Sequence, residues 1–242
     1  MNAVGRRAQV RKYLAGAGAL SAALLAWNNA ALPGLRWPPH WRAPANAAVG
    51  VAAVAAARAA GLNGTELRLS FTTIPSGVRT GMVVAALPAV VFTVAGVLPR
   101  LRGAIVSEGA VRDLTAGELI AWVAYHIPVG TVLCEELAFR AALDPMLERV
   151  FTRQSGDRAG RAAALLTSAA VFGLWHVVPA RASGDPVVPT VLFTTAGGVV
   201  FTLLARRSGS VVAPMIAHVT ANAGGALLAA RLRTPVSYGS QP

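Results

Sequence analysis

The uncharged stretch LIAWVAYHIPVGTVL, residues 119–133, runs directly into Cys134-Glu135-Glu136-Leu137-Ala138-Phe139-Arg140. An apolar run of this kind is typical of a membrane-embedded helix. A charged side chain at the centre of a bilayer costs roughly 2.5–3.5 kcal/mol on insertion scales. Two adjacent glutamates in such a place therefore indicate a partner or a function, and Arg140 is one candidate partner.

The composition of the whole chain agrees with a membrane protein. Of its 242 residues, 55% are hydrophobic and only 13% are charged, whereas a soluble domain has about 25% charged residues. We therefore predict an all-α fold, a polytopic transmembrane helical bundle of about seven or eight helices. The net charge of +12 does not indicate nucleic acid, because the arginines lie mainly between the apolar runs, as the positive-inside bias requires.

Seven apolar segments are candidate membrane spans, at about 13–32, 45–60, 78–98, 116–146, 162–178, 187–205 and 210–230. A helix needs about 20 apolar residues to cross a bilayer core. The second segment is short for a span and fits an interfacial or tilted helix, whereas the fourth is too long for one straight span. Pro128 and Gly130 predict a kink or break inside the fourth segment, and Thr115 with Glu118 has capping-box spacing at its start.

The basic residues predict an orientation. Arg6, Arg7, Arg11 and Lys12 precede the first apolar run, which we interpret as an uncleaved signal anchor. A cytoplasmic N-terminus places thirteen basic residues inside: Arg6, Arg7, Arg11, Lys12, Arg58, Arg68, Arg79, Arg149, Arg153, Arg158, Arg161, Arg206 and Arg207. It places eight outside: Arg36, Arg42, Arg100, Arg102, Arg112, Arg181, Arg231 and Arg233. This bias predicts a multi-pass protein of the cell membrane with its N-terminus in the cytoplasm.

Three polar motifs interrupt the apolar segments. In the first, Glu136 and Arg140 are four residues apart and share a helical face, while Glu135 is rotated by about 100° and is free to meet another neighbour. The second is Phe172-Gly173-Leu174-Trp175-His176, and the third is His218-Val219-Thr220-Ala221-Asn222. Each of these two also presents its outer residues on one face. His126 lies in an apolar run as well but belongs to no motif.

A single buried histidine or ion pair can be structural, but ionisable residues on three separate membrane helices indicate a functional site. A buried carboxylate can act as a general base, and a neutral histidine can share its proton or bind a metal. A second histidine and an asparagine amide can stabilise an oxyanion. This set predicts hydrolysis of a peptide bond within the membrane. The sequence has no His-Glu-x-x-His zinc motif, Gly-x-Ser-Gly serine motif or Gly-x-Gly-Asp motif, which removes other intramembrane protease chemistries.

These three motifs, complete and in order, resemble the CPBP or Abi family, which comprises type II CAAX prenyl endopeptidases and bacteriocin-processing and self-immunity proteins. The family pattern is Glu-Glu-x-x-x-Arg, Phe-x-x-x-His and His-x-x-x-Asn. The resemblance covers about residues 115–230. It implies a bundle of about eight helices whose site faces a cavity open to the membrane. One departure is Ala141, where the family often has glycine.

The resemblance also implies roles for the candidate site residues. Glu135 would activate water with help from His176, while His218 and Asn222 would form the oxyanion hole, and Glu136 and Arg140 would support them. Family members are often named metalloproteases, and Zn²⁺ would then be held by His176, His218 and Asn222. Asparagine is a poor zinc ligand, so we favour a mechanism that requires no cofactor.

The sequence thus predicts an intramembrane endopeptidase that acts on a membrane-associated peptide or protein in the lipid bilayer. The alternatives are a non-catalytic bacteriocin self-immunity or peptide-binding membrane protein, and a transporter with a buried proton relay. We divide the chain into a basic segment with the first membrane helix (1–44), membrane helices without a motif (45–114), the core that carries the motifs (115–230) and a C-terminal tail (231–242).

Overall fold

The computed structural model describes residues 3–98, 111 and 114–232 of the chain. These residues form helices and no strand, which confirms the predicted all-α class. The predicted outer residues Arg100, Arg102, Arg112 and Arg233 lie outside the described residues, as does nearly all of the predicted tail.

The helical elements are α1 (Ala3–Ala26), η1 (Trp27–Ala31), α2 (Leu32–Gly34), α3 (Pro39–Ala59), η2 (Phe71–Thr73), α4 (Ile74–Val97), α6 (Ala116–Ala121), η3 (Trp122–Leu133), η4 (Glu136–Leu143), α7 (Asp144–Ser155), α8 (Asp157–Trp175), α9 (Val177–Ser183), α10 (Val187–Ser208) and α11 (Val212–Arg231).

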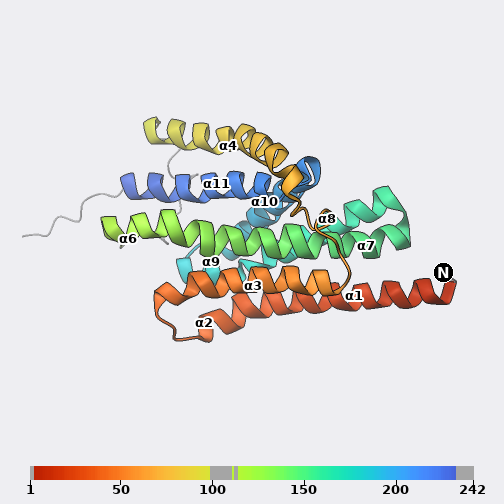
Figure 1. The fold of residues 1–242 in the computed structure, drawn as a ribbon. Helices are drawn as coiled ribbons and strands as arrows, with labels where there is room; N and C mark the ends of the chain where they lie inside the picture. The colour runs from red at the N-terminus through yellow and green to blue at the C-terminus, as the bar shows by residue number, and fades with distance from the viewer. Residues whose placement is uncertain (1–2, 99–110, 112–113, 233–242) are drawn as a thin grey trace, which may run out of the picture.

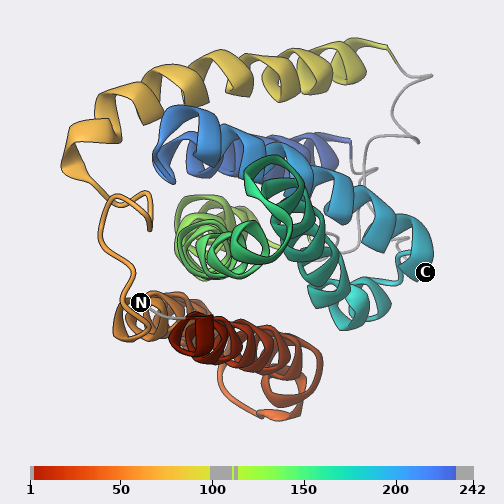
Figure 2. The same ribbon diagram turned by 90° about the vertical axis from the view of Figure 1, so that its right-hand side faces the viewer.

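The helices pack into a bundle (Figure 1), in which α1, α3 and the central helix run roughly alongside one another while α4 and α10 cross them at an angle (Figure 2). Seen along its length, the continuous helix α6–η3–η4–α7 occupies the middle (Figure 2). Helices α1 and α3 cover one side of it, α8 and α9 lie beside it, and α10 and α11 lie on the opposite side. Helix α4 is outermost and packs mainly on α11. The motif-bearing helices therefore meet around the central helix.

Within the part of the chain that the structure describes, five helices are long and apolar enough to cross a membrane: Phe71–Val97, Ala116–Ser155, Asp157–Ser183, Val187–Ser208 and Val212–Arg231. They match the last five of the seven predicted spans. The first two predicted spans, 13–32 and 45–60, are helical in α1–α2 and α3 but are not among the five. These two helices contribute Tyr13, Leu24, Ala53 and Ala57 to the buried core against the central helix.

The central helix does not break at Pro128 or Gly130, so a break there is wrong, while a kink stays a prediction. It continues from Ala116 to Ser155, and residues 122–133 and 136–143 adopt wider π-helical turns. A π-turn bonds residue i to i+5, and such turns often accommodate irregularities within helices. The predicted capping box is present, since Thr115 Oγ1 accepts a bond from the Glu118 amide and Glu118 Oε2 accepts one from the Thr115 amide.

The helix that carries the glutamates lies unusually close to α3. A Cβ atom built on Gly50 would lie 2.9 Å from Cys134 Cα, and one built on Gly130 would lie 2.8 Å from Ala43 Cα. Both glycines are thus required by close packing of backbones, an arrangement common between membrane helices. Cys134 is fully buried in this contact. The position of the adjacent Glu135 is therefore fixed by α3.

Candidate active site

Glu135 lies at the junction between the two π-helical stretches and is only 5% exposed. Its Oε1 accepts a hydrogen bond of 3.0 Å from the indole nitrogen of Trp175. Its Oε2 is buried and has no hydrogen-bond partner among the described residues. A buried carboxylate oxygen without a donor is costly in an apolar interior, so this oxygen is available for chemistry.

Glu136 and Arg140 form the predicted pair, with 3.4 Å between Glu136 Oε2 and Arg140 Nε. Both side chains are fully buried. The guanidinium makes no hydrogen bond to any described residue. It lies instead over the ring of Phe172, with its central carbon 4.1 Å from the ring centroid. A cation over an aromatic face is stabilised electrostatically, most strongly when it is desolvated, so Phe172 substitutes for part of the lost solvation.

His176 lies where α8 ends and α9 begins, with φ −92° and ψ 4°. This sparsely populated backbone region is often used by active-site residues. Helix α8 ends at Trp175, one turn before Pro179. A proline ring clashes with the carbonyl four residues before it, and for Pro179 that residue is Trp175. The break turns the His176 ring toward Glu135, with 3.9 Å between Nε2 and Oε1.

His218, on α11, contacts both glutamates. Its Nδ1 is 2.8 Å from Glu136 Oε1, and its Nε2 is 3.8 Å from Glu135 Oε2. Phe201 of α10 stacks on its ring, with centroids 4.6 Å apart. Asn222 follows one turn later on the same helix and is half-buried. The structure therefore brings Glu135, Glu136, Arg140, His176 and His218 into contact, and it gives no side-chain hydrogen bond of Asn222 to the part of the chain that it describes.

The hydrogen bonds of the two histidines define their tautomers. The Nδ1 atom of His176 lies 2.8 Å from the Phe172 carbonyl oxygen, which can only accept. The Nδ1 atom of His218 likewise faces an oxygen of Glu136. Each Nδ1 therefore carries a proton, and in the neutral ring each Nε2 presents a lone pair. Both lone pairs face the carboxylate of Glu135.

The residues fit a metal only in part. Imidazole nitrogens with a carboxylate suit Zn²⁺ chemically, and a histidine held by a carboxylate, as His218 is by Glu136, is typical of metal ligands. Within residues 3–98, 111 and 114–232, however, no three His, Cys, Asp or Glu side chains converge closely enough to hold an ion. The predicted ligand set of His176, His218 and Asn222 contains only two such residues, so that prediction stays open.

Trp175 and Phe201 contact the site but were not predicted as site residues. Trp175 lies within the second motif, but nothing in its spacing indicates that its N–H reaches Glu135. Phe201 is one apolar residue among many in its segment. Both contacts depend on how α8 and α10 pack on the central helix, and local sequence contains no signal for that packing.

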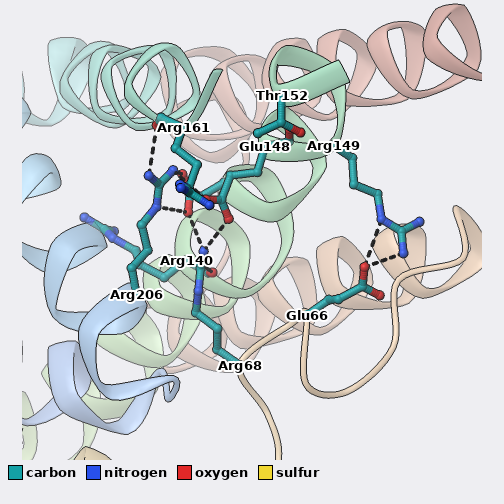
Figure 3. A network of polar contacts seen from close by, with 9 residues as sticks. Glu66, Arg68, Arg140, Glu148, Arg149, Thr152, Arg161 and Arg206 are labelled. Atoms are coloured by element: carbon teal, nitrogen blue, oxygen red, sulfur yellow. Dashed lines mark hydrogen bonds and ion pairs between the residues drawn. The ribbon is translucent and has the colours of Figure 1, made fainter. Parts of the chain in front are cut away.

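A second buried charge cluster lies one turn beyond Arg140, around Asp144. Asp144 Oδ1 accepts a bond of 2.6 Å from Arg206, and its Oδ2 accepts one of 2.8 Å from Arg68. Arg68 also donates to Glu148 Oε2 at 2.8 Å and to the Arg140 carbonyl at 2.5 Å. Figure 3 shows Arg68 and Arg206 approaching Glu148 from different elements, while the Glu66–Arg149 pair lies apart. This cluster fastens α10 and the 60–70 loop to the central helix.

The fold and the site together define a multi-pass helical membrane protein with a buried carboxylate–histidine cluster on its central helix. Residues 117–224 match the family described as Type II CAAX prenyl endopeptidase Rce1-like. The matched region includes every candidate site residue. A domain of this description is thus found at residues 117–224, and the match supports an intramembrane endopeptidase acting on a membrane-associated substrate. No curated protein and no solved structure matches the chain.

Proposed function

We propose that the protein is an intramembrane endopeptidase in which Glu135 activates the attacking water. The observation that carries the proposal is the convergence of two histidine Nε2 atoms on one buried carboxylate, at 3.9 and 3.8 Å. All three groups are hydrogen-bond acceptors when the rings are neutral and the acid is ionised. Acceptors cannot bond to one another, but a water molecule can donate its two protons to such a set.

In the first step, Glu135 takes a proton from water with His176 beside it, and the oxygen forms a bond to the peptide carbonyl carbon. The carbonyl becomes a tetrahedral oxyanion, for which the Asn222 amide is the proposed donor. His218 is the second proposed donor, in a form of the site whose Nε2 has taken up a proton from solvent before the attack. In the second step the carbon–nitrogen bond breaks. The proton held by Glu135 passes to the leaving nitrogen, which returns the carboxylate to its initial state.

Glu136 and Arg140 have a supporting role in this proposal. The bond from His218 Nδ1 to Glu136 holds the ring with Nε2 toward the reacting atoms. A carboxylate in this position also stabilises the imidazolium that oxyanion stabilisation requires, as in other hydrolytic sites. Arg140, 3.4 Å from Glu136, provides the opposite charge beside that buried carboxylate.

Zinc is the alternative cofactor, with the two histidines and Asn222 as its proposed ligands. When bound, Zn²⁺ lowers the pKa of a coordinated water to about 7. The metal-free route is supported by the donor set, because among the described residues no three His, Cys, Asp or Glu side chains form a group that could hold a metal, and asparagine is a poor zinc ligand. The orientation with a cytoplasmic N-terminus in the cell membrane is part of the same proposal.

The test is peptide cleavage by the purified full-length protein in proteoliposomes. Substrates are matched membrane-anchored peptides, one set ending in a prenylated cysteine and one set anchored by an apolar helix, with products identified by mass spectrometry. Wild type is expected to cleave at least one set, with cleavage lost in Glu135→Gln and retained after dialysis against a chelator. Loss of activity with the chelator and its return with Zn²⁺ would replace the glutamate mechanism by a metal-dependent one.

Two results would contradict the proposal. Tight binding of a peptide without cleavage, unchanged in Glu135→Gln, would identify a peptide-binding immunity protein. Proton-coupled flux that is lost in Glu135→Gln, again without cleavage, would identify a transporter.

A further inference from the structure

The α8–α9 break at His176 leaves helix-end groups that need partners. The last carbonyls of α8 and the first amides of α9 have no partner within their own helices. In a membrane interior such groups cannot rely on bulk water, and each unsatisfied one costs several kcal/mol. The break that orients His176 is therefore stable only if something else bonds these groups.

Two asparagines from the N-terminal part of the chain supply these bonds. Asn29 donates from Nδ2 to the Leu174 carbonyl at 3.0 Å and accepts at Oδ1 from the Val178 amide at 2.9 Å. One side chain thus caps the end of α8 and the start of α9 together. Asn28, buried, donates from Nδ2 to the Trp175 carbonyl at 2.8 Å. This is the carbonyl that Pro179 prevents from pairing within the helix.

The same turn is also tied to the helix that carries Glu135. The indole nitrogen of Trp27 donates to Asn46 Oδ1 at 2.9 Å, and Asn46 Nδ2 donates to the Gly130 carbonyl at 3.0 Å. Gly130 lies little more than one turn before Glu135 on the central helix. The side chains of Trp27, Asn28, Asn29 and Asn46, which we call the asparagine bracket, therefore connect the two backbones that carry Glu135 and His176.

We infer that the asparagine bracket positions the active site, so that α1–η1 and α3 contribute to catalysis although the bracket lies outside the matched region 117–224. Asn28 and Asn29 hold the break in α8 at one place. This in turn fixes the His176 ring at Glu135 Oε1 and the Trp175 N–H on the same oxygen. The expected effect on catalysis rests on the proposed function, whereas the expected effect on the conformation of the α8–α9 break rests on these hydrogen bonds alone.

The experiment compares Asn28→Ala, Asn29→Ala and the double variant with wild type in proteoliposomes. Ser21→Ala is the matched control, because Ser21 lies on α1 and, among the described residues, its hydroxyl donates only to the Ala17 carbonyl of its own helix. A displacement of about 1 Å at a reacting group can cost on the order of 100-fold in rate. We expect kcat to fall about tenfold in each single variant and about 100-fold in the double variant, with KM changed by less than about twofold. Ser21→Ala should match wild type.

Two readouts do not depend on activity. Amide hydrogen exchange in a peptide covering residues 174–183 should accelerate by at least about tenfold in the double variant, because the Val178 amide loses its acceptor. Exchange in peptides from α11 should not change. The emission of Trp175, obtained as the difference from Trp175→Phe in the same background, should shift to longer wavelength because the indole loses its fixed partner.

Wild-type exchange and emission in the double variant would overturn the inference. So would a rise in KM at constant kcat, or faster exchange spread equally over α4 and α11, which would indicate general destabilisation. If wild type cleaves no peptide, the proposed function fails, while local loss of protection at 174–183 with a shifted Trp175 emission still supports the bracket.

Discussion

Two carboxylate–arginine clusters lie a few residues apart on the central helix, and they differ in how completely their polar atoms are bonded. In the Asp144 cluster, both carboxylate oxygens accept bonds from arginines at 2.6 and 2.8 Å. In the glutamate cluster, Glu135 Oε2, Glu136 Oε2 and the Arg140 nitrogens have no hydrogen-bond partner among the described residues. Asp144 and Glu136 are both fully buried, so these two carboxylates differ in how many of their oxygens are hydrogen-bonded and not in burial. A network in which every polar atom is hydrogen-bonded stabilises a fold, whereas buried polar atoms without hydrogen-bond partners indicate a functional site.

The largest effect is expected when the glutamate cluster loses Glu135, its proposed general base. Glu135→Gln keeps the size of the side chain but cannot accept a proton, so kcat should fall by about 10³-fold, within the range for general-base removal. The unfolding temperature in detergent should stay within about 2 °C of wild type. Glu148→Gln, in the other cluster, is the matched control and should retain kcat within about threefold. Equal losses in the two variants would contradict the contrast between the clusters.

The second effect is on stability and concerns Asp144. Asp144→Ala removes the carboxylate that bonds both Arg68 and Arg206 and leaves them Glu148 as an acidic partner. The loss should therefore lie near the lower end of the roughly 3–5 kcal/mol that breaking a buried pair on one side costs. Denaturant unfolding in micelles measures this loss. Asp144→Asn retains one acceptor oxygen and should cost less. A loss below about 1 kcal/mol in Asp144→Ala, combined with normal folding and no activity, would assign Asp144 to the reaction instead of the fold.

A smaller effect is expected at Trp175. Trp175→Phe keeps an aromatic ring beside Phe139, whose centroid lies 5.6 Å from that of the tryptophan, but it removes the N–H that bonds Glu135. Hydrogen bonds to charged groups contribute about 1.5–3 kcal/mol, so kcat should fall by roughly 10-fold or more at constant stability. Steady-state kinetics in the same liposomes measure the change in kcat. An unchanged kcat together with an unchanged pH–rate profile would show that the Trp175 N–H has no role in the reaction.

The smallest effect concerns the Glu66–Arg149 pair outside both clusters. Partial burial tends to raise the pKa of Glu66, but hydrogen bonds from Arg149 and the Asn63 amide outweigh it and lower that pKa below its ordinary value. The stabilisation is therefore fully present above the pKa of the unfolded chain and is lost as pH falls through the lower pKa of the folded protein. Because the pair is partly exposed, Glu66→Gln should cost only roughly 0.5 kcal/mol at pH 7. The difference in unfolding free energy between Glu66→Gln and wild type should vanish in acid, which denaturant unfolding at several pH values measures.

Local spacing in the sequence was enough to predict part of the site. Glu136 and Arg140 are four residues apart, and the ion pair between them follows from helical geometry alone. The same rule placed Glu135 on a different face, where it meets His176. The five apolar segments from residue 78 onward were also correctly predicted as helices long enough to span a membrane.

Other features depend on tertiary packing and could not be predicted. His218 contacts both glutamates because α11 crosses the central helix at that height, and the sequence alone does not specify the crossing. The central helix continues through Pro128 in π-helical turns, which a rule based on proline in regular α-helices does not anticipate. The asparagine bracket joins residues more than 140 positions apart, from Asn28 to Trp175. A polar pair such as Asn28-Asn29 in an apolar run is the signal that could have pointed to it.

The most direct test of the central claim is a paired measurement on Glu135→Gln and Asp144→Asn, purified and reconstituted together with wild type. Cleavage of a membrane-anchored peptide and the unfolding temperature are measured on the same samples. The account predicts that Glu135→Gln loses cleavage by about 10³-fold at wild-type stability, and that Asp144→Asn loses stability while its folded fraction still cleaves. Cleavage at the wild-type rate by Glu135→Gln would contradict the account.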